Sequence, residues 1–533
     1  MKISMNENRT VTGTGAPVTP RQILETRVES APDSVAFQYI IKKKQTVSVT
    51  CGQFWREVNA MGVFFYRHGL YGKRIAVLGE NSYEWILTWF AVVLSGNVVV
   101  PLDKDQRPEE LAELLSRCEA EALVCSGQYY DVAETLHAAD AVKRVLSMED
   151  IPLILEHSSG LLDECGIETS GDTVCTIIFT SGTTGEQKGV MLTRRNLASD
   201  AFNASRSLCV KGSSVLTLPL HHTFGFTVGV LAAYLCGYPI CISKSLRTFN
   251  KDLQSFAPVN LVLVPLYVET MYKAVWKTAR EQGMEKKLRR MIRWSRALRM
   301  LGIDLREKLF RSVRQPFGGE LRHIVCGGAF LDQHYIDGMD ELGVKVLNGY
   351  GITECSPVVA VNRSDRRRKG SVGQPLPGVE VRILDNEICV RGENVMPGYF
   401  RDEKATAAVM ADGWFHTGDL GYLDRDGFLF LTGRKKNLIV LSNGENVSAE
   451  ELEGRLLRIP NVEEVVVRAE DDVITAEIYC LDKNGINGAV EQLNRELPPF
   501  KRIGRVVFRD EEFEKTTTRK IKRYESGKEV SHV

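Results

Sequence analysis

The stretch at residues 177–190, IIFTSGTTGEQKGV, decides which fold we predict for this chain. An apolar run ends at Thr180, and Lys188 stands just beyond a block of small or hydroxylated residues. That block is Ser181, Gly182, Thr183, Thr184 and Gly185. Small residues let the main chain approach an anion closely, and their N–H groups can line a phosphate. Because the hydroxyls add donors and Lys188 adds a positive charge, the pattern predicts a loop that binds nucleotide phosphates.

Two other interpretations of this stretch have to be weighed. The nucleotide loop G-x-x-x-x-G-K-[ST] cannot be laid on it, because Gln187 stands where the glycine before the lysine belongs. An ordinary surface turn is also rich in glycine, serine and threonine, and it is the simplest alternative. The stretch alone therefore does not decide the function, and the rest of the chain has to be considered.

Composition excludes several classes of protein. With 533 residues the chain is too long for one ordinary core, so two or more domains are expected. Its 68 basic residues balance 68 acidic ones, which argues against a protein that binds nucleic acid through bulk charge.

The 12 cysteines form no CxxC pair and no ligand pattern with histidine, as expected for a reduced chain without a structural zinc site. The first residues lack the apolar region of a secretory signal, so we expect a cytoplasmic protein.

Apolar, strand-like runs alternate with helical stretches through most of the chain. These runs are residues 74–78, 122–125, 174–179, 261–265 and 321–326. Two longer uncharged runs, 85–102 and 224–243, approach the length of a membrane span. Each contains an internal break with glycine, so a buried helix followed by a strand explains it better. The alternation predicts an α/β fold with parallel sheets covered by helices on both faces.

The pattern changes twice toward the end of the sequence. From Gly370 onward, short strands alternate with Gly and Pro turns, which predicts a β-rich subdomain at about 360–432. Residues 451–459 then predict a helix, and residues 462–467 and 473–481 predict strands. We therefore expect an N-terminal domain over 1–432 and a small α+β C-terminal domain over 433–533, with the boundary at 433–437.

Residues 180–189, TSGTTGEQKG, resemble the signature T-S-G-T-T-G-x-P-K-G of the adenylate-forming enzymes, with Gln187 in place of proline. This family includes acyl-CoA synthetases, luciferases and the adenylation domains of peptide synthetases. Further matches follow in the family's order. They are LPLHHTFG (218–225), CGGA (326–329), NGYGITE (348–354), VRGENVMPGY (390–399), GWFHTGDL (413–420), GRKKNLIVLSNGENVSAEELE (433–453) and KTTTRKIKR (515–523). The resemblance covers the chain from the phosphate loop to the tail, and it implies a C-terminal domain that moves as a lid.

The resemblance also implies an ATP site. Thr353 matches the residue that bonds the α-phosphate, and Glu354 matches the carboxylate that holds Mg²⁺, a cation that prefers oxygen ligands. Asp419 matches the carboxylate that accepts both ribose hydroxyls, and Arg434 also reaches the ribose. The residues expected beside adenine are Asn348, Gly349, Tyr350, Gly351, Gly328 and Ala329. Taken alone, Tyr350 would be a core tyrosine, Thr353–Glu354 a helix start and Asp419 a turn residue.

Three further residues acquire expected roles in the same way. His222 matches the family histidine beside the carboxylate pocket, although His221 stands where the family has an aromatic residue. Lys520 falls into register with the tail lysine of the family motif P-K-T-x-x-G-K-I, which acts when the acid attacks ATP. Glu514 replaces the proline of that motif and Arg519 replaces its glycine. Lys436 occupies the position of the hinge about which the C-terminal domain swings. Taken alone, His222 would be a structural histidine, Lys520 part of a solvated basic strand end and Lys436 an exposed loop lysine.

The reaction that the resemblance implies has two halves. A carboxylate attacks the α-phosphorus of ATP, giving an acyl-adenylate and pyrophosphate, and the thiol of CoA then attacks the acyl carbonyl and expels AMP. Positioning and electrostatic stabilisation should therefore dominate catalysis, with ATP, Mg²⁺ and CoA as the implied cofactors and co-substrates. Transfer to an acyl carrier protein and activation of an aromatic acid remain open, and a non-catalytic nucleotide-binding protein is a third alternative.

The form of the 433–453 motif and a helical region at 281–314 resemble the long-chain fatty acyl-CoA synthetase branch most closely. That region alternates apolar Leu288, Met291, Ile292 and Leu298 with the basic residues Lys286, Lys287, Arg289, Arg290, Arg293, Arg296 and Arg299. A basic amphipathic helix suits peripheral contact with an anionic membrane, here its inner face. The alternative is a helix whose apolar face packs on the protein. Small residues, Gly225, Gly229, Ala232 and Ala233, leave room for an acyl chain or permit close helix packing.

Overall fold

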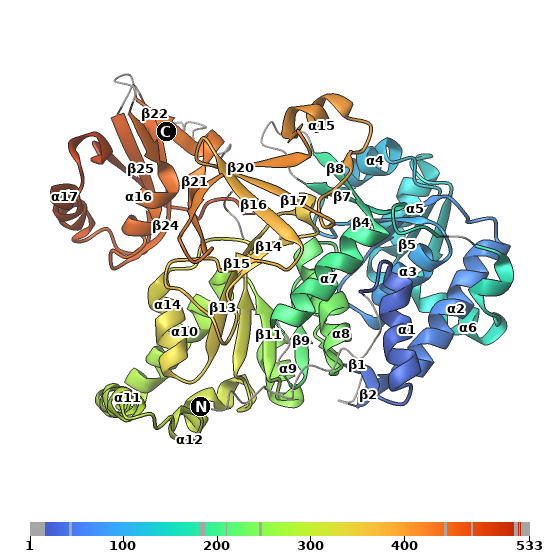
Figure 1. Cartoon of the computed structure of the whole chain (residues 1–533), viewed down its shortest axis with the longest axis horizontal. Coiled ribbons are helices and arrows are strands. Elements are labelled where there is room, and N and C mark those ends of the chain that lie inside the picture. Colours follow the sequence, from blue (N-terminus) through green and yellow to red (C-terminus); the bar gives the residue numbers. More distant parts are fainter. Residues whose placement is uncertain are drawn as a thin grey trace.

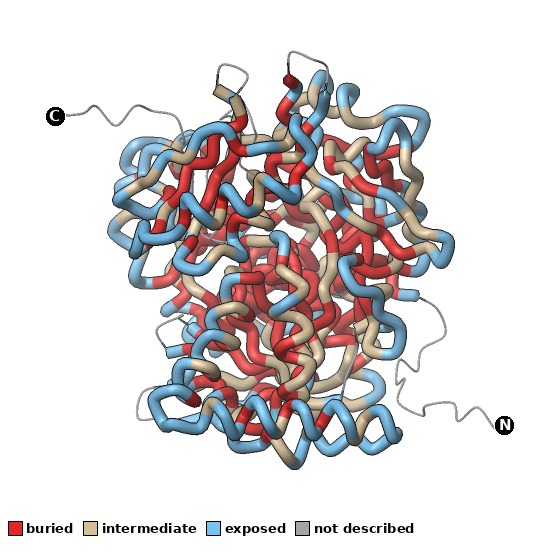
Figure 2. Tube along the Cα trace, turned by 90° about the vertical axis from the view of Figure 1, so that its left-hand side faces the viewer, coloured by how far each residue is buried: buried red, intermediate tan, exposed pale blue. Residues whose placement is uncertain are grey.

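The computed structural model describes residues 16–41, 45–167, 169–180, 187–208, 211–244, 248–441, 445–470, 473–515, 521 and 523. The predicted α/β fold is confirmed, and Figure 1 shows its large helical and sheet-rich body together with a smaller C-terminal unit. Two large sheets, both parallel in their centres, form the body. Buried residues concentrate inside, and exposed residues line the outer helices and turns (Figure 2).

The first large sheet has nine strands in the order β15-β14-β13-β12-β11-β9-β10-β1-β2. All pairs from β1 to β13 in this order are parallel, and the strands at both edges are antiparallel. The strands are β1 (Val35–Ile40), β2 (Thr46–Thr50), β9 (Ser214–Leu216), β10 (Ile240–Ile242), β11 (Asn260–Leu263), β12 (His323–Cys326), β13 (Lys345–Gly351), β14 (Val358–Val361) and β15 (Gln374–Pro375). The segments predicted to bind adenine lie in this sheet or directly after one of its strands.

The second large sheet has seven strands in the order β18-β8-β7-β4-β3-β5-β6. Its strands from β7 to β6 in this order are parallel, whereas β8 pairs antiparallel with both β7 and β18. The strands are β3 (Arg74–Leu78), β4 (Val98–Leu102), β5 (Ala122–Cys125), β6 (Arg144–Ser147), β7 (Val174–Thr180), β8 (Lys188–Thr193) and β18 (Gly398–Tyr399). The predicted phosphate loop therefore joins two adjacent strands of one sheet.

Helices and sheets alternate in five layers. Side chains of β3 point alternately to two cores: Ile75 and Val77 face the central helices, and Ala76 and Leu78 face the outer ones. Helices α3, α7 and η5 lie between the two sheets, α4 and α5 cover the second sheet, and α9, α10, α11 and α14 cover the first. The helices up to that point are α1 (Pro20–Ser30), α2 (Cys51–Arg67), α3 (Tyr83–Leu94), α4 (Pro108–Arg117), α5 (Tyr130–Ala138), α6 (Ile151–His157), α7 (Arg194–Leu208), η5 (Phe224–Ala232), α8 (Ala233–Cys236), α9 (Phe249–Phe256), α10 (Pro265–Glu281), α11 (Glu285–Met300), α12 (Arg306–Leu309), α13 (Arg311–Arg314) and α14 (Gln333–Glu341).

Both uncharged runs are a helix followed by a strand, as predicted. The first run forms α3 and β4. Because α3 lies between the two large sheets, it is apolar on all sides. The Ser82 side chain caps its first turn by accepting a hydrogen bond from the Trp85 N–H. The second forms η5, a π-helix, then α8 and β10. Among the described residues, no helix is both long and apolar enough to cross a bilayer. Several strand boundaries differ from the prediction. The run at 261–265 ends as a strand at Leu263, because Pro265 begins α10. The run at 321–326 begins as a strand at His323, and the strand predicted at 462–467 continues to Glu470.

The predicted β-rich and α+β units are also present. Five strands, β16 (Val379–Leu384), β17 (Glu387–Gly392), β19 (Met410–Ala411), β20 (Trp414–Leu423) and β21 (Leu429–Arg434), form an antiparallel sheet beside α15 (Glu403–Val409). The C-terminal unit contains η8 (Lys435–Asn437), β22 (Leu438–Val440), β23 (Asn446–Ser448), α16 (Ala449–Leu456), β24 (Val462–Glu470), β25 (Val473–Cys480), α17 (Ile486–Glu496) and β26 (Arg505–Arg509). These elements share a core of their own, and the exact boundary at 433–437 stays a prediction.

Candidate active site

Tyr350, Asp419 and Arg434 meet at the junction of the first large sheet and the antiparallel sheet. Asp419 and Arg434 are cross-strand partners on β20 and β21, and the Arg434 Nε donates to Asp419 Oδ1 at 2.5 Å. The Tyr350 hydroxyl, from β13, donates to Asp419 Oδ2 at 2.7 Å. Tyr350 and Asp419 are both buried, and burial together with the Asp419 charge raises the pKa of Tyr350 well above its usual range. Three residues predicted to bind one nucleotide are thus in direct contact.

The turn that presents Asp419 is fixed by hydrogen bonds. The Thr417 hydroxyl donates to the Ile388 carbonyl at 2.8 Å and accepts from the Asp419 N–H at 3.0 Å. Gly418 has φ +70°, a left-handed conformation that glycine adopts without strain, and its N–H donates to Glu387 Oε1 at 2.8 Å. The sequence HTGDL therefore forms a rigid support for one carboxylate.

Glu354 lies close to the lysine of the phosphate loop. The Tyr399 hydroxyl donates to Glu354 Oε1 at 2.9 Å, and Lys188 Nζ lies 4.9 Å from the centroid of the same tyrosine ring. Tyr399 is on β18 and Lys188 on β8, and these two strands are paired. Strand pairing therefore brings together two motifs that are far apart in the sequence.

Buried polar bonds hold the loop that carries Thr353 and Glu354. Asn394 Nδ2 donates to the carbonyls of Cys355 and Val358, at 3.0 Å and 3.1 Å, and the Met396 N–H donates to the Glu354 carbonyl at 2.8 Å. Thr353 and Glu354 are themselves only half-buried in the short 3₁₀ helix η7 (Thr353–Cys355). The loop is rigid while both side chains stay accessible to a ligand.

The phosphate loop is described only at its two ends. Thr180 ends β7, Lys188 begins β8, and the two residues are cross-strand partners. The block Ser181, Gly182, Thr183, Thr184 and Gly185 lies outside the described residues. Its contact with phosphate therefore stays a prediction.

The residues predicted to contact adenine lie in the second half of β13, at 348–351, and just after the end of β12, at 328–329. Asn348 Oδ1 is buried and accepts no hydrogen bond from the described residues, so a ligand amino group could satisfy it. Gly328 has φ +89°, and Ala329 is exposed. Gly351 is required for packing rather than for ligand approach, because a Cβ there would lie 2.2 Å from the Pro357 carbonyl oxygen.

His222 is half-buried at the start of the segment that leads into η5, and its ring centroid lies 4.2 Å from that of His221. His221 is the more buried of the two, and its Nε2 lies 3.6 Å from an Asp103 carboxylate oxygen. Burial lowers the pKa of His221 to about 3, with Lys104 acting in the same direction, so this imidazole is neutral.

The interior beside η5 is tightly packed. A cavity of about 10 Å³ lies between η5 and the second large sheet, and Trp89 and Phe226 line it with ring centroids 4.1 Å apart. A Cβ at Gly225 would lie 2.3 Å from the Pro219 carbonyl oxygen, and one at Gly229 would lie 2.8 Å from Leu216. These two glycines therefore permit close packing, the second of the two interpretations considered above.

Lys436 lies beside the cluster of Asp419, Arg434 and Glu354. Partial burial, followed by the charges of Arg434 and Lys188, lowers the pKa of Lys436 to about 8, although Asp419 and Glu354 act in the opposite direction. Its side chain remains exposed to solvent. Three cations, Lys188, Arg434 and Lys436, thus lie near two carboxylates, Asp419 and Glu354, and the excess positive charge favours an anionic ligand.

Lys520 lies outside the described residues, but its neighbours in the tail are anchored. Lys515 forms ion pairs with Glu464 and Glu512, and Arg523 forms an ion pair with the buried Glu453 on α16. Lys515 and Arg523 are therefore held by ion pairs to the C-terminal unit, and the position of Lys520 stays a prediction.

Glu354 alone cannot complete the coordination of Mg²⁺, so the remaining ligands would have to come from the substrate and water. No group of three or more His, Cys, Asp or Glu side chains that could hold a metal occurs in the described part of the chain. Mg²⁺ is commonly bound by one or two carboxylates together with substrate phosphates and waters. Glu354, half-buried and acceptor-only when ionised, fits that single role.

A larger cavity, of about 330 Å³, lies on another side of Lys188. It is lined by Arg117, Phe179, Gln187, Lys188, Phe400, Arg401 and Asp402. Of the predicted ATP-binding residues that the structure describes, Lys188 alone lines it. This cavity is therefore adjacent to the site assembled above and not identical with it.

Tyr399 and Asn394 lie in the motif at 390–399, but no role was predicted for either residue from the sequence. Tyr399 contacts both Glu354 and Lys188, and Asn394 holds the Glu354 loop. Both residues lie in the matched motif, but the groups to which these two side chains donate lie 36–45 residues away in the sequence, so no local pattern indicated the contacts.

Comparison with known proteins adds independent information. The AMP-binding enzyme family matches residues 24–400. The long-chain-fatty-acid–CoA ligase FadD15 of Mycobacterium bovis is 31% identical over 86% of this chain and 81% of its own, and the indoleacetate–CoA ligase of Aromatoleum aromaticum is 30% identical over 82% and 84%. The structure of o-succinylbenzoate CoA synthetase of Bacillus subtilis with ATP and magnesium is similar with a TM-score of 0.75, at 23% identity over 94% of this chain and 98% of that one.

Proposed function

Since the chain belongs to the AMP-binding enzyme family and is an ATP-dependent, adenylate-forming acid–CoA ligase, we propose that its acid is a medium- or long-chain fatty acid. The overall reaction then converts the fatty acid, ATP and CoA into acyl-CoA, AMP and pyrophosphate, with Mg²⁺. The fatty-acid ligase among its relatives supports this choice of acid.

The apolar lining of the cavity beside η5 carries this proposal. The cavity beside η5 is lined by the apolar side chains of Trp89, Pro101, Ile178, Leu197, Leu220 and Phe226 and by three threonines, with no charged residue. A second carboxylate or an ammonium group on the substrate would be buried there without a partner, which is costly. An uncharged, apolar acyl chain fits this lining best.

In the first half-reaction, the residues of the site bind and orient ATP. Asp419 already accepts from Tyr350 and Arg434, but each carboxylate oxygen has a second lone pair that can accept from a ribose hydroxyl. Lys188 and Lys436 place positive charge where the phosphates would lie. Mg²⁺, when held by Glu354 and phosphate oxygens, would supply further charge stabilisation.

His222 directly precedes Thr223, which lines the apolar cavity, and its proposed role is to orient the attacking carboxylate. Lys520, brought in by the C-terminal domain, then stabilises the charge that gathers at the α-phosphorus. In the second half-reaction the domain turns about Lys436 and carries Lys520 away, so that the CoA thiol reaches the acyl carbonyl.

An aromatic acid is the second candidate, because the indoleacetate–CoA ligase is nearly as similar as the fatty-acid ligase. A panel of fatty, aromatic and dicarboxylic acids, scored by pyrophosphate release, separates these candidates. Mass spectrometry with either CoA or acyl carrier protein as acceptor identifies the thiol. Preference for indoleacetate over every fatty acid would contradict the proposal.

A long chain needs more room than about 10 Å³, so Trp89 and Phe226 must move to admit it. Phe226→Ala should therefore increase activity with longer acids relative to shorter ones. Thr227→Val, which keeps the volume of a neighbouring lining residue, is the matched control and should leave the chain-length profile unchanged.

A further inference from the structure

Helix α11 packs on the first large sheet by one face only. Leu288, Ile292 and Ser295 are buried on that face, and Leu288 and Ile292 belong to the same core as α10 and α14. Three of the four apolar residues in the predicted amphipathic pattern, Leu288, Met291 and Ile292, therefore pack on the core. This part of the pattern follows the alternative interpretation, a helix packed by its apolar face.

The opposite face of α11 carries apolar side chains that packing does not explain. Trp294 is 67% exposed, Met300 84% and Leu301 75%, and Ile303 in the next turn is 46% exposed. Residues 290, 293, 294, 297 and 301 recur at three- and four-residue spacing and thus lie on one side of the helix. The face is therefore basic in its first half and apolar at its C-terminal end.

The cations of this face lack carboxylate partners. Arg289 pairs with Glu285 at 2.8 Å and Arg296 pairs with Glu341, both at the flanks of the helix. By contrast, Lys286, Lys287, Arg290 and Arg293 are exposed and form no ion pair with any residue that the structure describes. The positive charge of the outward face is thus uncompensated.

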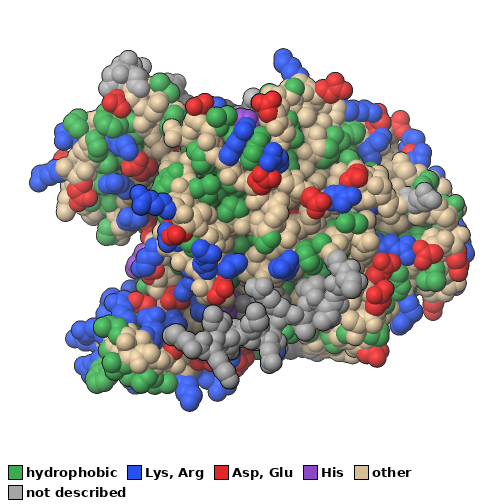
Figure 3. Space-filling view, in the orientation of Figure 1, with side chains coloured by type: hydrophobic (Ala, Val, Ile, Leu, Met, Phe, Trp, Pro, Cys, Tyr) green, Lys and Arg blue, Asp and Glu red, His purple; other side chains and the backbone are tan. Residues whose placement is uncertain are grey.

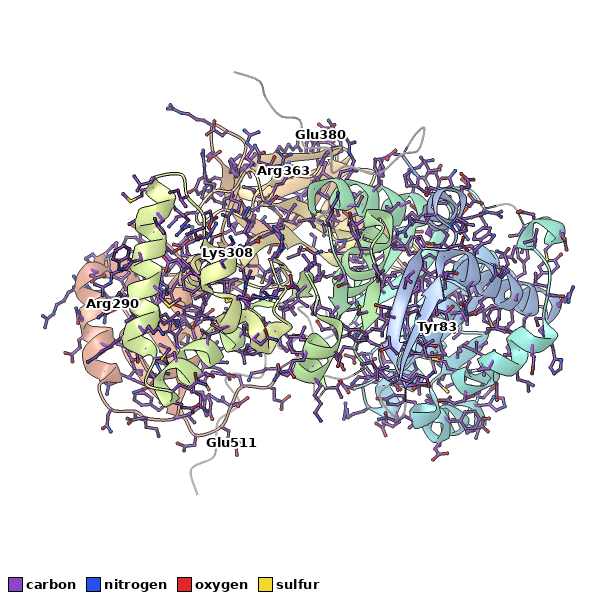
Figure 4. The ribbon with its side chains drawn as sticks, turned by 90° about the horizontal axis from the view of Figure 1, so that it is seen from below. Tyr83, Arg290, Lys308, Arg363, Glu380 and Glu511 are labelled. Atoms are coloured by element: carbon purple, nitrogen blue, oxygen red, sulfur yellow. The ribbon has the colours of Figure 1, made fainter. Side chains whose placement is uncertain are left out.

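The position of α11 leaves this face open. Helix α11 lies at the lower left corner of the molecule in Figure 1, and the lower rim in Figure 2 is pale blue along its outer side. Figure 4, which looks up at that edge, shows α11 in front of the other elements, with Arg290 labelled. In Figure 3, Lys and Arg side chains gather around a green hydrophobic patch in the same region.

We infer that this face of α11 docks on an anionic lipid bilayer, with Trp294, Met300 and Leu301 in the interfacial region and the four unpaired cations against the lipid headgroups. Tryptophan prefers the membrane interface, and interfacial helices combine such residues with Lys and Arg. A second copy of the chain fits less well, because an isologous contact would bring unpaired cations against each other. A nucleic acid would leave the apolar end without a partner. The docking does not depend on which acid the enzyme activates.

Sedimentation of the full chain with vesicles tests this inference. The wild type should bind vesicles of phosphatidylcholine with phosphatidylglycerol, more weakly as salt rises, and should bind phosphatidylcholine alone much less. Arg290→Glu with Arg293→Glu, and separately Trp294→Glu with Met300→Glu, should each weaken binding about tenfold or more. Arg289 and Arg296 are unsuitable for this test, because reversing them would break ion pairs within the protein.

The matched control is Leu481→Glu, which alters a side chain that is 80% exposed on the C-terminal unit and should leave binding unchanged. Thermal melting and pyrophosphate release with a soluble short-chain acid verify that each variant is folded. Absence of wild-type binding, equal binding to both vesicle types, or undiminished binding of the two α11 variants would each overturn the inference.

Discussion

Asp419 and Arg434 are cross-strand partners, and the Arg434 Nε donates to Asp419 Oδ1 at 2.5 Å while the Tyr350 hydroxyl donates to the other carboxylate oxygen at 2.7 Å. One buried carboxylate thus joins the first large sheet to the antiparallel sheet, directly before the C-terminal unit begins. A ribose bound there would contact the residue on which both sheets converge.

Asp419→Asn should weaken ATP binding. The change removes a charge-assisted hydrogen bond, which contributes about 1.5–3 kcal/mol, so KM for ATP should rise about ten- to a hundredfold. Steady-state pyrophosphate release at varied ATP measures this. Asp412→Asn, at an exposed turn with φ +51°, is the control and should leave KM unchanged. An unaltered KM in Asp419→Asn would remove the ribose role from this residue.

Glu354→Gln should make the enzyme dependent on high Mg²⁺. The amide removes one negative ligand, so adenylate formation should fall at limiting Mg²⁺ and recover in part as Mg²⁺ rises. Titration of Mg²⁺ in the pyrophosphate assay measures the shift. Glu393→Gln, an exposed glutamate one residue before Asn394, should show the wild-type dependence. Equal activity of Glu354→Gln and wild type at every Mg²⁺ concentration would defeat the assignment.

ATP affinity should depend on pH through Lys436. Its pKa is about 8 in the free protein because of partial burial and nearby cations, and a bound polyphosphate raises it. The contribution of Lys436 to affinity is therefore complete below pH 8 and is lost as pH rises through the higher pKa of the complex. Lys436→Met should flatten this part of the binding profile, measured by calorimetry. Lys435→Met is the control and should keep the wild-type profile, because Lys435 pairs with Glu387 at 3.2 Å. If the steep pH dependence survives in Lys436→Met, Lys436 does not lie beside the bound phosphates.

Stability should depend on pH through Glu453. Burial raises the pKa of this carboxyl to about 7, although Arg523 opposes the shift. The folded state therefore holds a proton that the unfolded chain has lost, and stability falls as pH rises from the unfolded pKa of 4.5 through 7. Glu453→Gln should flatten this decline in denaturant titrations, whereas the exposed Glu491→Gln should not. A decline of the same slope in Glu453→Gln would show that another group causes it.

The fold was largely predictable because its central strands and helices are buried on both sides. Such elements appear as continuous apolar runs, and β3, β5 and α3 were found in this way. The error at residues 261–265 arose where apolar composition continues from β11 into α10, and only the preference of proline for the first helical turn marks the change.

The candidate site residues could be named from the sequence, but the contacts between them could not. The pairing of β8 with β18 brings Tyr399 to Lys188, and that pairing has no local signal. The amphipathic pattern of α11 likewise indicated a surface helix, but only the fold decides that Leu288 faces the core and Trp294 faces solvent.

The two half-reactions can be separated through Lys520, and this separation tests the proposed mechanism most directly. The measurement is mass spectrometry of acyl-adenylate and acyl-CoA, with wild type and Lys520→Ala supplied either with fatty acid and ATP or with synthetic acyl-adenylate and CoA. We predict that the wild type makes acyl-adenylate from fatty acid and ATP without CoA. Lys520→Ala should make none, yet it should convert the supplied adenylate into acyl-CoA at a rate close to that of the wild type. Normal adenylate formation by Lys520→Ala, or no adenylate from the wild type with any fatty acid, would contradict the mechanism.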